Sequence, residues 1–155
     1  MATHAISNTG QAWRTSDLAT DTVIRFIEGP FLAPMLKAHA EWWHSGGERG
    51  RRAIFDGFDL RDAVLAGADL RGASFRNARL DGADLSDALL QHADFEGAVL
   101  TEATFTDAIC VDASFRQSDL RGVDFGGADL GGADLHDASL IGVSFLDADL
   151  EFAYF

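Results

Sequence analysis

Cysteine is almost absent from this chain, and several other features that assign proteins to common classes are missing too. Cys110 is the one cysteine among 155 residues, which excludes an internal disulfide framework. The sequence has no run of about 18 apolar residues, so we expect no transmembrane span. Its first residues lack the basic stretch followed by an apolar stretch that marks a secretory signal. We therefore expect a cytoplasmic location.

Basic residues are scarce in the last two thirds of the chain. The net charge is −13, yet residues 1–52 carry +1 and residues 53–155 carry −14. A field of this sign repels the phosphates of nucleic acids and membranes and attracts basic surfaces. The charge therefore argues against direct binding to nucleic acid or membrane and favours a protein partner with a basic surface.

A five-residue repeat occupies residues 53–155. Every fifth position from Phe55 to Phe155 is Leu or Phe, with Cys110 as the one exception, which makes 21 units. Ala stands two positions before each of these residues, with four exceptions: Phe58, Ser118, Val123 and Val143. Helices repeat near 3.6 residues and strands at 2, so a period of five fits neither element. It fits a solenoid whose chain turns a corner every five residues and buries its apolar face by stacking coil on coil.

The residues 20 positions apart show how many units make one coil. One series is nearly all Phe from Phe55 to Phe155, the next is all Leu from Leu60 to Leu140, and a third changes once from Leu to Phe. Like residues stack on like when coils repeat at the strand spacing of about 4.8 Å. We therefore predict four units per coil, about five coils and a rod about 25 Å long.

The repeat units resemble those of the pentapeptide-repeat family, whose motif is approximately A-(D/N)-(L/F)-X-X. Clear examples are Ala68-Asp69-Leu70-Arg71-Gly72, Ala83-Asp84-Leu85-Ser86-Asp87 and Ala128-Asp129-Leu130-Gly131-Gly132. The resemblance covers about two thirds of the chain. It implies an all-β solenoid, a right-handed quadrilateral β-helix. The residues before the repeat add a small N-terminal α-helical cap to this predicted fold.

The residues before the repeat divide into two segments. We expect a flexible N-terminus at 1–14 and a helical cap segment at 15–52, followed by the β-helix at 53–155. Helices are predicted at 16–28 and from Pro34 to His44, because Pro is favoured in a first turn and Ser45-Gly46-Gly47 ends the pattern. An open solenoid end exposes strand edges and core, so it needs a cover.

Two groups in this segment have alternative interpretations. Trp42 and Trp43 are expected to cover the open first coil, where Phe58 in place of Ala fits a larger space; the alternative is a partner-binding role. The cluster of Arg49, Arg51 and Arg52 is interpreted as a solvated turn rather than an anion site.

When the charges are sorted by side of the coil, one side has alternating charges and two sides are strongly acidic. We number the sides from the pentad 53–57, so that each side gathers the pentads 20 residues apart. On the first side, the position after the inward residue alternates in sign along Asp56, Arg76, Glu96, Arg116 and His136. The third and fourth sides together carry −9. The predicted partner-binding acidic face is formed by Asp69, Asp84, Asp87, Asp107, Asp112, Asp124, Asp129, Asp147 and Asp149.

The last repeat ends in aromatic residues. Phe152, Tyr154 and Phe155 leave an apolar edge, and exposed apolar ends favour association. A two-fold end-to-end homodimer would cover this edge and close the assembly. The family resemblance points the same way; the alternative is a monomer whose end covers itself.

Catalytic and metal-binding patterns were not found. The solenoid interior is filled by Leu, Phe and Ala, and Cys110 is an inward core residue. His39 and His44 are five positions apart on a predicted helix and do not share a face. The glycine-rich run from Gly126 to Asp134 superficially resembles calcium-binding solenoids, but those repeat every nine residues. We expect no enzyme, no cofactor and no metal site.

The sequence therefore predicts a non-enzymatic, acidic protein-interaction module that presents flat charged faces to a partner protein. The family resemblance implies an alternative, a DNA mimic that modulates or protects the type II topoisomerase DNA gyrase. The short rod and the lack of an evident loop insertion count against this alternative.

Overall fold

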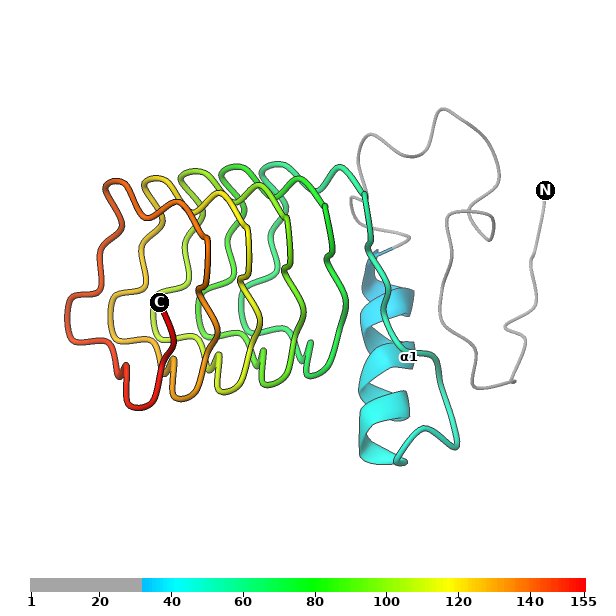
Figure 1. The fold of residues 1–155 in the computed structure, drawn as a ribbon. Helices are drawn as coiled ribbons and strands as arrows, with labels where there is room; N and C mark the ends of the chain where they lie inside the picture. Colours follow the sequence, from blue (N-terminus) through cyan, green and yellow to red (C-terminus); the bar gives the residue numbers. More distant parts are fainter. Residues whose placement is uncertain (1–31) are drawn as a thin grey trace.

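The computed structural model describes residues 32–155 of the chain. The predicted flexible segment 1–14 and the predicted helix at 16–28 lie outside the described residues. Helix α1 spans Leu32–His44 and is joined by a loop at 45–52 to the repeat region (Figure 1). It ends at the predicted residue but begins two residues before Pro34. Proline is tolerated there because the first four N–H groups of a helix have no intrahelical acceptor.

The repeat region is a stack of coils joined by single parallel bridges. Each bridge pairs a residue with the one 20 positions later, from Ile54 with Ser74 to Asp134 with Tyr154. The bridging residue stands just before the inward Leu or Phe, and two turn residues follow the inward residue. The 20-residue register confirms four pentads per coil. Figure 1 shows the coils side by side as a rod with α1 at one end.

Backbone hydrogen bonds connect every coil to the next. The N–H of an inward residue donates to a carbonyl 19 positions later, as from Phe95 to Ser114 at 2.7 Å. A turn N–H makes a second bond of the same kind, as from Gly97 to Arg116 at 2.9 Å. The polar groups of these very short strands are thus paired without long β-strands.

Aromatic stacking fills the solenoid core. Phe55, Phe75, Phe95 and Phe115 form a column with ring centroids 4.7–5.0 Å apart and planes within 18° of each other. Phe105, in the third-side column, meets Phe95 and Phe115 edge-on at 5.7 Å. The predicted stacking of like on like is confirmed for the Phe column. Phe58 is buried and packs edge-on against Phe55 at 6.0 Å.

Helix α1 contacts the first coil through residues that the sequence did not single out. Leu32 and Met35 join the apolar core cluster of the solenoid. His39 is fully buried, and its Nδ1 accepts a hydrogen bond of 3.0 Å from the N–H of Ala53, the first residue of the repeat. This bond satisfies one donor of the open coil edge, which is the task of a cap.

The tryptophans lie beside the coils rather than inside the open end. Trp42 stacks on His39, with centroids 5.5 Å apart, and both tryptophans are half-buried. A Cβ placed on Gly72 would lie 2.9 Å from Cζ3 of Trp43, so this ring covers the Gly72 corner. Trp43 also stacks on His92, one coil further, at 6.4 Å. The pair therefore packs against the solenoid, as the covering interpretation expected, but mainly on its flank.

The arginine cluster after α1 is not the solvated turn that we predicted. Arg51 is buried, with 9% of its surface exposed, and its N–H donates to the carbonyl of Ala38 at 2.9 Å. Arg52 donates from Nε to the carbonyl of Gly72 at 2.7 Å and lies over the Trp42 ring. Arg49 alone is exposed. The prediction failed because long side chains with apolar stems pack where helix and coil meet.

Candidate functional site: the acidic sides of the solenoid

Two repeating backbone positions hold the acidic side chains. The first is the bridging position before the inward residue, where an Asp carboxylate accepts the N–H two residues later. Asp124 accepts from Gly126 at 2.9 Å, and Asp129 accepts from Gly131 at 3.0 Å. This local bond tightens the turn, as the sequence predicted for Asp. It also fixes where the second carboxylate oxygen points.

The second position is the corner residue, two after the inward residue. Its φ is positive, near +57°, in Asp87, Asp107 and Asp147. Glycine occupies many of the other corners, and Asp and Asn tolerate this left-handed conformation better than most residues. The corner aspartates are exposed, so they form the outermost acidic groups of the rod.

The third side carries acids without cations. Its five aspartates are Asp84, Asp87, Asp107, Asp124 and Asp147, and none of them makes an ion pair with any residue of the described chain. The hydroxyl and N–H of Ser86 both donate to Asp84, and these bonds lower the pKa of that carboxyl. The other four side chains are exposed. This side therefore presents four exposed carboxylates, and a fifth that is partly buried beside Ser86, to solvent or a partner.

The fourth side is divided along the rod. Near α1, Asp69 pairs with Arg71 at 2.6 Å, and the hydrogen bonds from Arg71 lower the pKa of Asp69. Arg71 also lies over the Trp43 ring at 5.3 Å. Asp112 lies 3.8 Å from His92. Further along, Asp129 and Asp149 make only turn hydrogen bonds within the described structure.

Asp69 therefore differs from the other predicted face residues. Its carboxylate is half-buried beside α1 and already neutralised by Arg71. The sequence placed it on the correct side but had no means to show which aspartate Arg71 contacts. Glu151, on the same side near Asp149, was counted in the side charge but not among the candidate residues; it is exposed and adds to the open acidic part.

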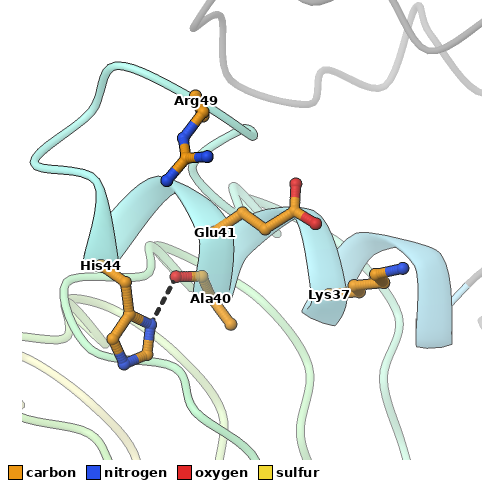
Figure 2. Close-up of a pocket in the computed structure, with 5 residues that line it drawn as sticks. All are labelled: Lys37, Ala40, Glu41, His44 and Arg49. Carbon is orange, nitrogen blue, oxygen red and sulfur yellow. Dashed lines mark hydrogen bonds between the residues drawn. The ribbon is translucent and has the colours of Figure 1, made fainter.

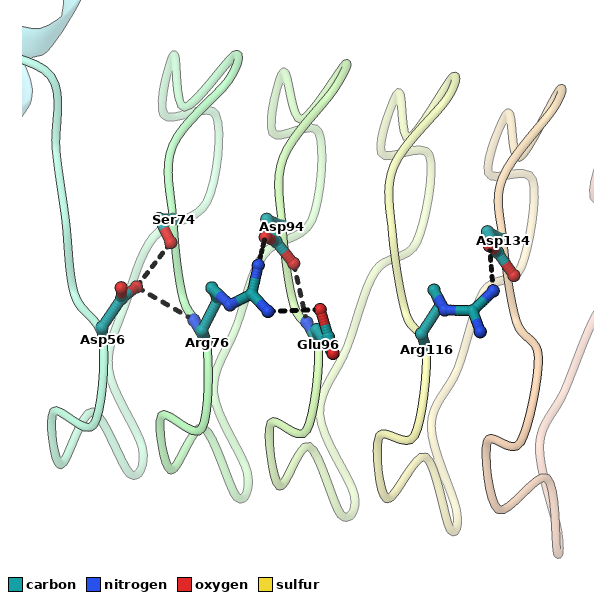
Figure 3. Close-up of polar contacts among 7 residues, drawn as sticks. All are labelled: Asp56, Ser74, Arg76, Asp94, Glu96, Arg116 and Asp134. Carbon is teal, nitrogen blue, oxygen red and sulfur yellow. Dashed lines mark hydrogen bonds and ion pairs between the residues drawn. The ribbon is translucent and has the colours of Figure 1, made fainter.

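The first and second sides contain most of the ion pairs, which join arginines to six of the ten acidic residues on these sides. Arg76 pairs with Asp94 at 2.9 Å and with Glu96 at 2.5 Å (Figure 3). Arg116 pairs with Asp134 at 2.8 Å instead of with its column neighbours. Burial favours the protonated acid, but hydrogen bonds from Arg116 and His136 prevail and lower the pKa of Asp134 to about 2.

The second side is held by pairs within a single turn. Arg61 pairs with Asp59 and Arg121 with Asp119, each at 2.6 Å. Arg79 pairs with Asp81 at 3.3 Å. Because these ion pairs offset part of the negative charge, the second side is far less acidic than the third. The structure therefore contains the difference that the sequence predicted: the first and second sides hold ion pairs, and the aspartates of the third side make none among the described residues.

The predicted end patch is exposed in the structure. The exposed fractions are 76% for Phe152, 57% for Tyr154 and 58% for Phe155. Ile141 and Leu146, in the same last coil, are also exposed, at 74% and 71%. Large exposed apolar side chains thus gather on the last coil, whereas none of the described residues between Val64 and Ile141 is one.

No catalytic arrangement appears in the described residues. A cavity of about 430 Å³ follows α1 and is lined by Lys37, Ala40, Glu41, His44 and Arg49 (Figure 2). His44 turns toward the solenoid, away from Lys37, and its Nδ1 lies 2.7 Å from the carbonyl oxygen of Ala40. Burial raises the pKa of the Cys110 thiol, which suits a core residue and not a nucleophile.

Metal and membrane features were searched in the same residues. The described part of the chain has no group of three or more His, Cys, Asp or Glu side chains placed to hold a metal ion. Within residues 32–155, no helix has the length and apolar character that crossing a bilayer needs.

Solved structures with a similar fold include several pentapeptide repeat proteins. Rfr23 from the cyanobacterium Cyanothece 51142 is 31% identical with a TM-score of 0.55, over 56% of this chain and 59% of its own. HetL, involved in heterocyst differentiation regulation in Nostoc, is 28% identical with a TM-score of 0.52, over 66% of this chain and 57% of its own. The protein alr5209 from Nostoc is 27% identical with a TM-score of 0.55, over 70% of this chain and 93% of its own.

The chain spans about three fifths of Rfr23 and of HetL. Comparison with curated proteins finds no match. The family model for pentapeptide repeats matches eight copies, at residues 51–82, 83–122 and 118–155. The 20-residue register, the stacked core and this match, which runs through the whole repeat region, agree: the chain belongs to the pentapeptide-repeat family.

Proposed function

We propose that this protein is a non-enzymatic interaction module whose third side, together with the outer part of the fourth, docks a basic surface of a partner protein. The observation that carries the proposal is the third side, with five aspartates and no ion pair in the described chain. Opposite charges across an interface steer association and fix its register. The partner is a protein, since the same field repels nucleic acid and anionic membranes.

The test compares two triple variants of equal charge change. Asp84→Asn, Asp124→Asn and Asp129→Asn together remove three open carboxylates, while Asn keeps an oxygen that can accept the turn N–H. We expect partner binding to weaken tenfold or more, if each lost charge pair contributes about 0.5–1 kcal/mol. The measurement is affinity capture from the native host, followed by titration of the identified partner at low and moderate salt.

The matched control is Asp59→Asn, Asp94→Asn and Asp119→Asn. These three aspartates already pair with arginines on the first and second sides. If the control weakens binding as much as the open-face variant, net charge alone explains the effect. If neither variant changes binding at moderate salt, the acidic sides are not the docking surface.

The DNA-mimic alternative is a narrower form of the same proposal. Its support is the family resemblance and the acidity. Its weakness is that the rod is short and that arginines on the first and second sides pair with many of the carboxylates there. A DNA mimic would inhibit or protect DNA gyrase in a supercoiling assay with the purified protein. Absence of any effect at a large molar excess would remove this alternative and leave the general interaction role.

We also propose that Phe152, Tyr154 and Phe155 form an end-to-end homodimer contact. The support is the exposure of all three aromatic side chains on the last coil. The double substitution Phe152→Asp and Tyr154→Asp is expected to halve the mass in solution, measured by light scattering. The control is Val64→Asp, at an apolar residue 73% exposed on the first coil. An unchanged mass of the double variant would contradict the dimer.

The cap segment, the handedness of the coil and the cellular location are also proposals. We take residues 15–52 to be the cap segment, because Met35 and His39 of α1 bury against the first coil. We take the coil to be right-handed and quadrilateral, as the family resemblance implies. A cytoplasmic location remains our proposal from the sequence.

A further inference from the structure

Three large apolar residues lie next to one another on the outside of the fourth side. Leu89 and Ile109 are bridged to each other in successive coils, and Val111 follows the inward Cys110. Side chains alternate between the two faces of a strand, so these three point away from the core, in which Leu90 and Cys110 have no exposed surface. We call Leu89, Ile109 and Val111 the apolar patch. All three are half-buried.

The fold does not require apolar residues at these outward positions. Each pentad has three of them: the bridging residue, the residue after the inward one, and the corner. In residues 73–132, the other three sides carry one large apolar residue at such positions, Val99, and otherwise polar residues or glycine. The bridging partner of Ile109 in the next coil is Asp129, so this row accepts a charged residue as well. The apolar patch therefore has no explanation in the repeat itself.

The backbone beneath the patch is already paired. The N–H of Leu89 donates to the carbonyl of Ala68 at 2.9 Å, and the carbonyl of Leu89 accepts from Leu70 at 2.8 Å. Ile109 makes the corresponding two bonds at 3.0 Å and 2.8 Å. A partner strand would need free N–H and C=O groups to add to a sheet, and this row offers none. An occupant of the patch therefore meets side chains.

The direction of the patch favours a helix over a strand as the occupant. Its row runs along the rod with one residue per coil, and coils repeat at about 4.8 Å. One turn of an α-helix advances about 5.4 Å, so a helix lying along this side can place an apolar side chain against each of two successive coils. Residues on one face of a strand are about 6.6–6.8 Å apart, which fits the coil spacing less well.

Open carboxylates border the patch on the edge toward the third side. Asp87 and Asp107 are exposed at the two corners there, and neither makes an ion pair within residues 32–155. The opposite edge holds His92 and Asp112, which lie 3.8 Å apart. Charge complementarity therefore favours an occupant with Lys or Arg beside its apolar residues and disfavours an acidic one.

We propose that the apolar patch docks an amphipathic α-helix of the partner protein. The apolar stripe of that helix contacts the patch, and Lys or Arg residues along one border of the stripe face Asp87 and Asp107. The inference rests on the proposed function, because it names the kind of segment that the partner brings to the acidic sides. It is narrower than that function, since a basic surface can dock there without burying any apolar side chain.

One pair of substitutions makes the patch polar without changing charge. Ile109→Thr with Val111→Thr keeps β-branched side chains, and the third side of the same coil already carries Thr104 and Thr106 at the two equivalent positions. The matched control is Val99→Thr, at the bridging position of the second side in the same coil. We call the first variant the Thr pair.

A second pair of substitutions removes the charge at the border of the patch. Asp87→Asn with Asp107→Asn suits the corner geometry, because Asn77 occupies a corner with a φ of +56°. The matched control is Asp62→Asn with Glu102→Gln, which removes the same charge from two corners of the second side. We call the variant at Asp87 and Asp107 the Asn pair.

The probe is a fluorescein-labelled helix peptide of about 14 residues, or about four turns, with Leu at helical spacing and Lys elsewhere. One comparison peptide replaces each Leu by Gln, which keeps the charge and a good helix propensity. The other alternates Leu and Lys, the pattern of a strand. By fluorescence anisotropy, we expect the helix peptide to bind the wild type about fivefold more tightly than either comparison peptide.

The two variants should affect the helix peptide in different ways. We expect the Thr pair to weaken its binding about fivefold or more, and Val99→Thr to change it less than about twofold. The Asn pair should weaken binding more than its control does and should reduce the salt dependence. In an NMR titration, the methyl signals of Leu89, Ile109 and Val111 should shift before those of the other sides.

The outcomes separate the patch from the acidic docking surface. If the Gln peptide binds as tightly as the helix peptide and the Thr pair changes nothing, the patch is overturned and acidic docking stands. If the strand peptide binds as tightly as the helix peptide, the assignment to a helix is overturned. If the Asn pair binds like the wild type, the basic border is overturned. A helix peptide that does not bind at about 1 mM overturns the inference, whereas the proposed function is judged by its own partner titration.

Two other occupants of the patch would give distinct results. A lower solution mass for the Thr pair than for the wild type would assign the patch to a second copy of the chain. Signals of residues 1–31 that shift together with those of the patch when the peptide is added would assign it to the chain's own N-terminal segment. Either result overturns a helix of the partner. Circular dichroism establishes that each variant keeps its fold.

Discussion

Phe95→Ala is expected to destabilise the protein by about 3–5 kcal/mol, the range for removing a fully buried Phe side chain. Phe95 has no exposed surface and lies in the middle of the aromatic column. Its ring stacks on Phe75 at 4.7 Å and on Phe115 at 5.0 Å, and meets Phe105 edge-on at 5.7 Å. The substitution removes all three contacts and leaves a cavity between coils that are tied by backbone hydrogen bonds and cannot collapse. Urea denaturation followed by circular dichroism measures the loss.

Two further variants show whether the loss comes from the stack. Phe95→Leu keeps an inward apolar side chain of the kind that Leu135 provides in the same column, so we expect a loss of only about 1–1.5 kcal/mol. Phe155→Ala removes the same ring from the last coil, where 58% of it is exposed, and should cost less than about 1 kcal/mol. A Phe95→Ala loss as small as that of Phe155→Ala would contradict a tightly packed aromatic column.

A weakened middle coil should also change the cooperativity of unfolding. In a solenoid each coil contacts only its neighbours, so stability is approximately a sum of coil and interface contributions. Phe95 belongs to an inner coil, and its loss weakens the interfaces on both of its sides. We therefore expect a broader transition for Phe95→Ala than for Phe155→Ala.

The repeat itself was predictable because one physical requirement fixes it. A side chain that points inward every five residues, with Ala beside it, fits only a chain that turns at each unit. The 20-residue series from Phe55 to Phe115 then required rings to stack on rings, and the structure has them 4.7–5.0 Å apart. The Asp–turn hydrogen bonds followed from local chemistry, since they join residues two positions apart.

The ion-pair partners were less predictable, because several carboxylates lie within reach of each arginine. The column pattern pointed Arg116 toward Glu96, yet it pairs with Asp134 in the next coil. Asp134 stands at a bridging position, and its other oxygen accepts the N–H of His136 at 3.0 Å. A carboxylate held in place by its turn loses less side-chain entropy on pairing than a free Glu side chain. The sequence does not show which carboxylate is held in this way; the structure does.

The role of His39 was missed for a different reason. The sequence was searched for histidine pairs on one helix face, as a metal site would need, and His39 and His44 failed that test. In the structure, His39 instead accepts a hydrogen bond from Ala53, and this contact depends on how α1 docks on the first coil. The signal available in the sequence was weak: a polar residue one turn after Met35 on a helix expected to cover an apolar end.

Lowering the pH from 7 to 4 is expected to release α1 from the solenoid through His39. Burial is the main cause that lowers the pKa of His39 from 6.5 to about 4. The charge of Asp69 and the backbone of Arg71 oppose this shift, and the charges of Arg52 and Arg71 add to it. The neutral ring accepts the N–H of Ala53 through Nδ1, and its Nε2 has no hydrogen-bond partner in the described chain. Protonation would remove the acceptor and leave a charge in an apolar place.

The sign of the effect follows from the proton count. Above pH 6.5 both folded and unfolded states hold a neutral His39, so the full stability is present. Between pH 6.5 and 4 the unfolded chain binds a proton that the folded chain refuses, so stability falls as the pH falls. The depressed pKa corresponds to a loss of up to about 3 kcal/mol across this window. Asp59, Asp69, Asp119 and Asp134, whose pKa values are also lowered, lose their stabilising pairs mainly below this window.

His39→Asn is the control that isolates this residue, because its Oδ1 can take the place of Nδ1 as acceptor and does not titrate. We expect the variant to be less stable than the wild type at pH 7, since it fills less space, but to lose little further stability between pH 6.5 and 4. Both proteins carry Trp13→Phe, so that Trp42 and Trp43 are the remaining tryptophans. Urea denaturation followed by their fluorescence reports on α1, and circular dichroism reports on the coils. If the wild type and the variant show the same pH dependence, His39 does not link the cap to pH. If the tryptophan signal changes before the coils unfold, α1 leaves as a separate unit, as expected for a helix that contacts only one end of a solenoid.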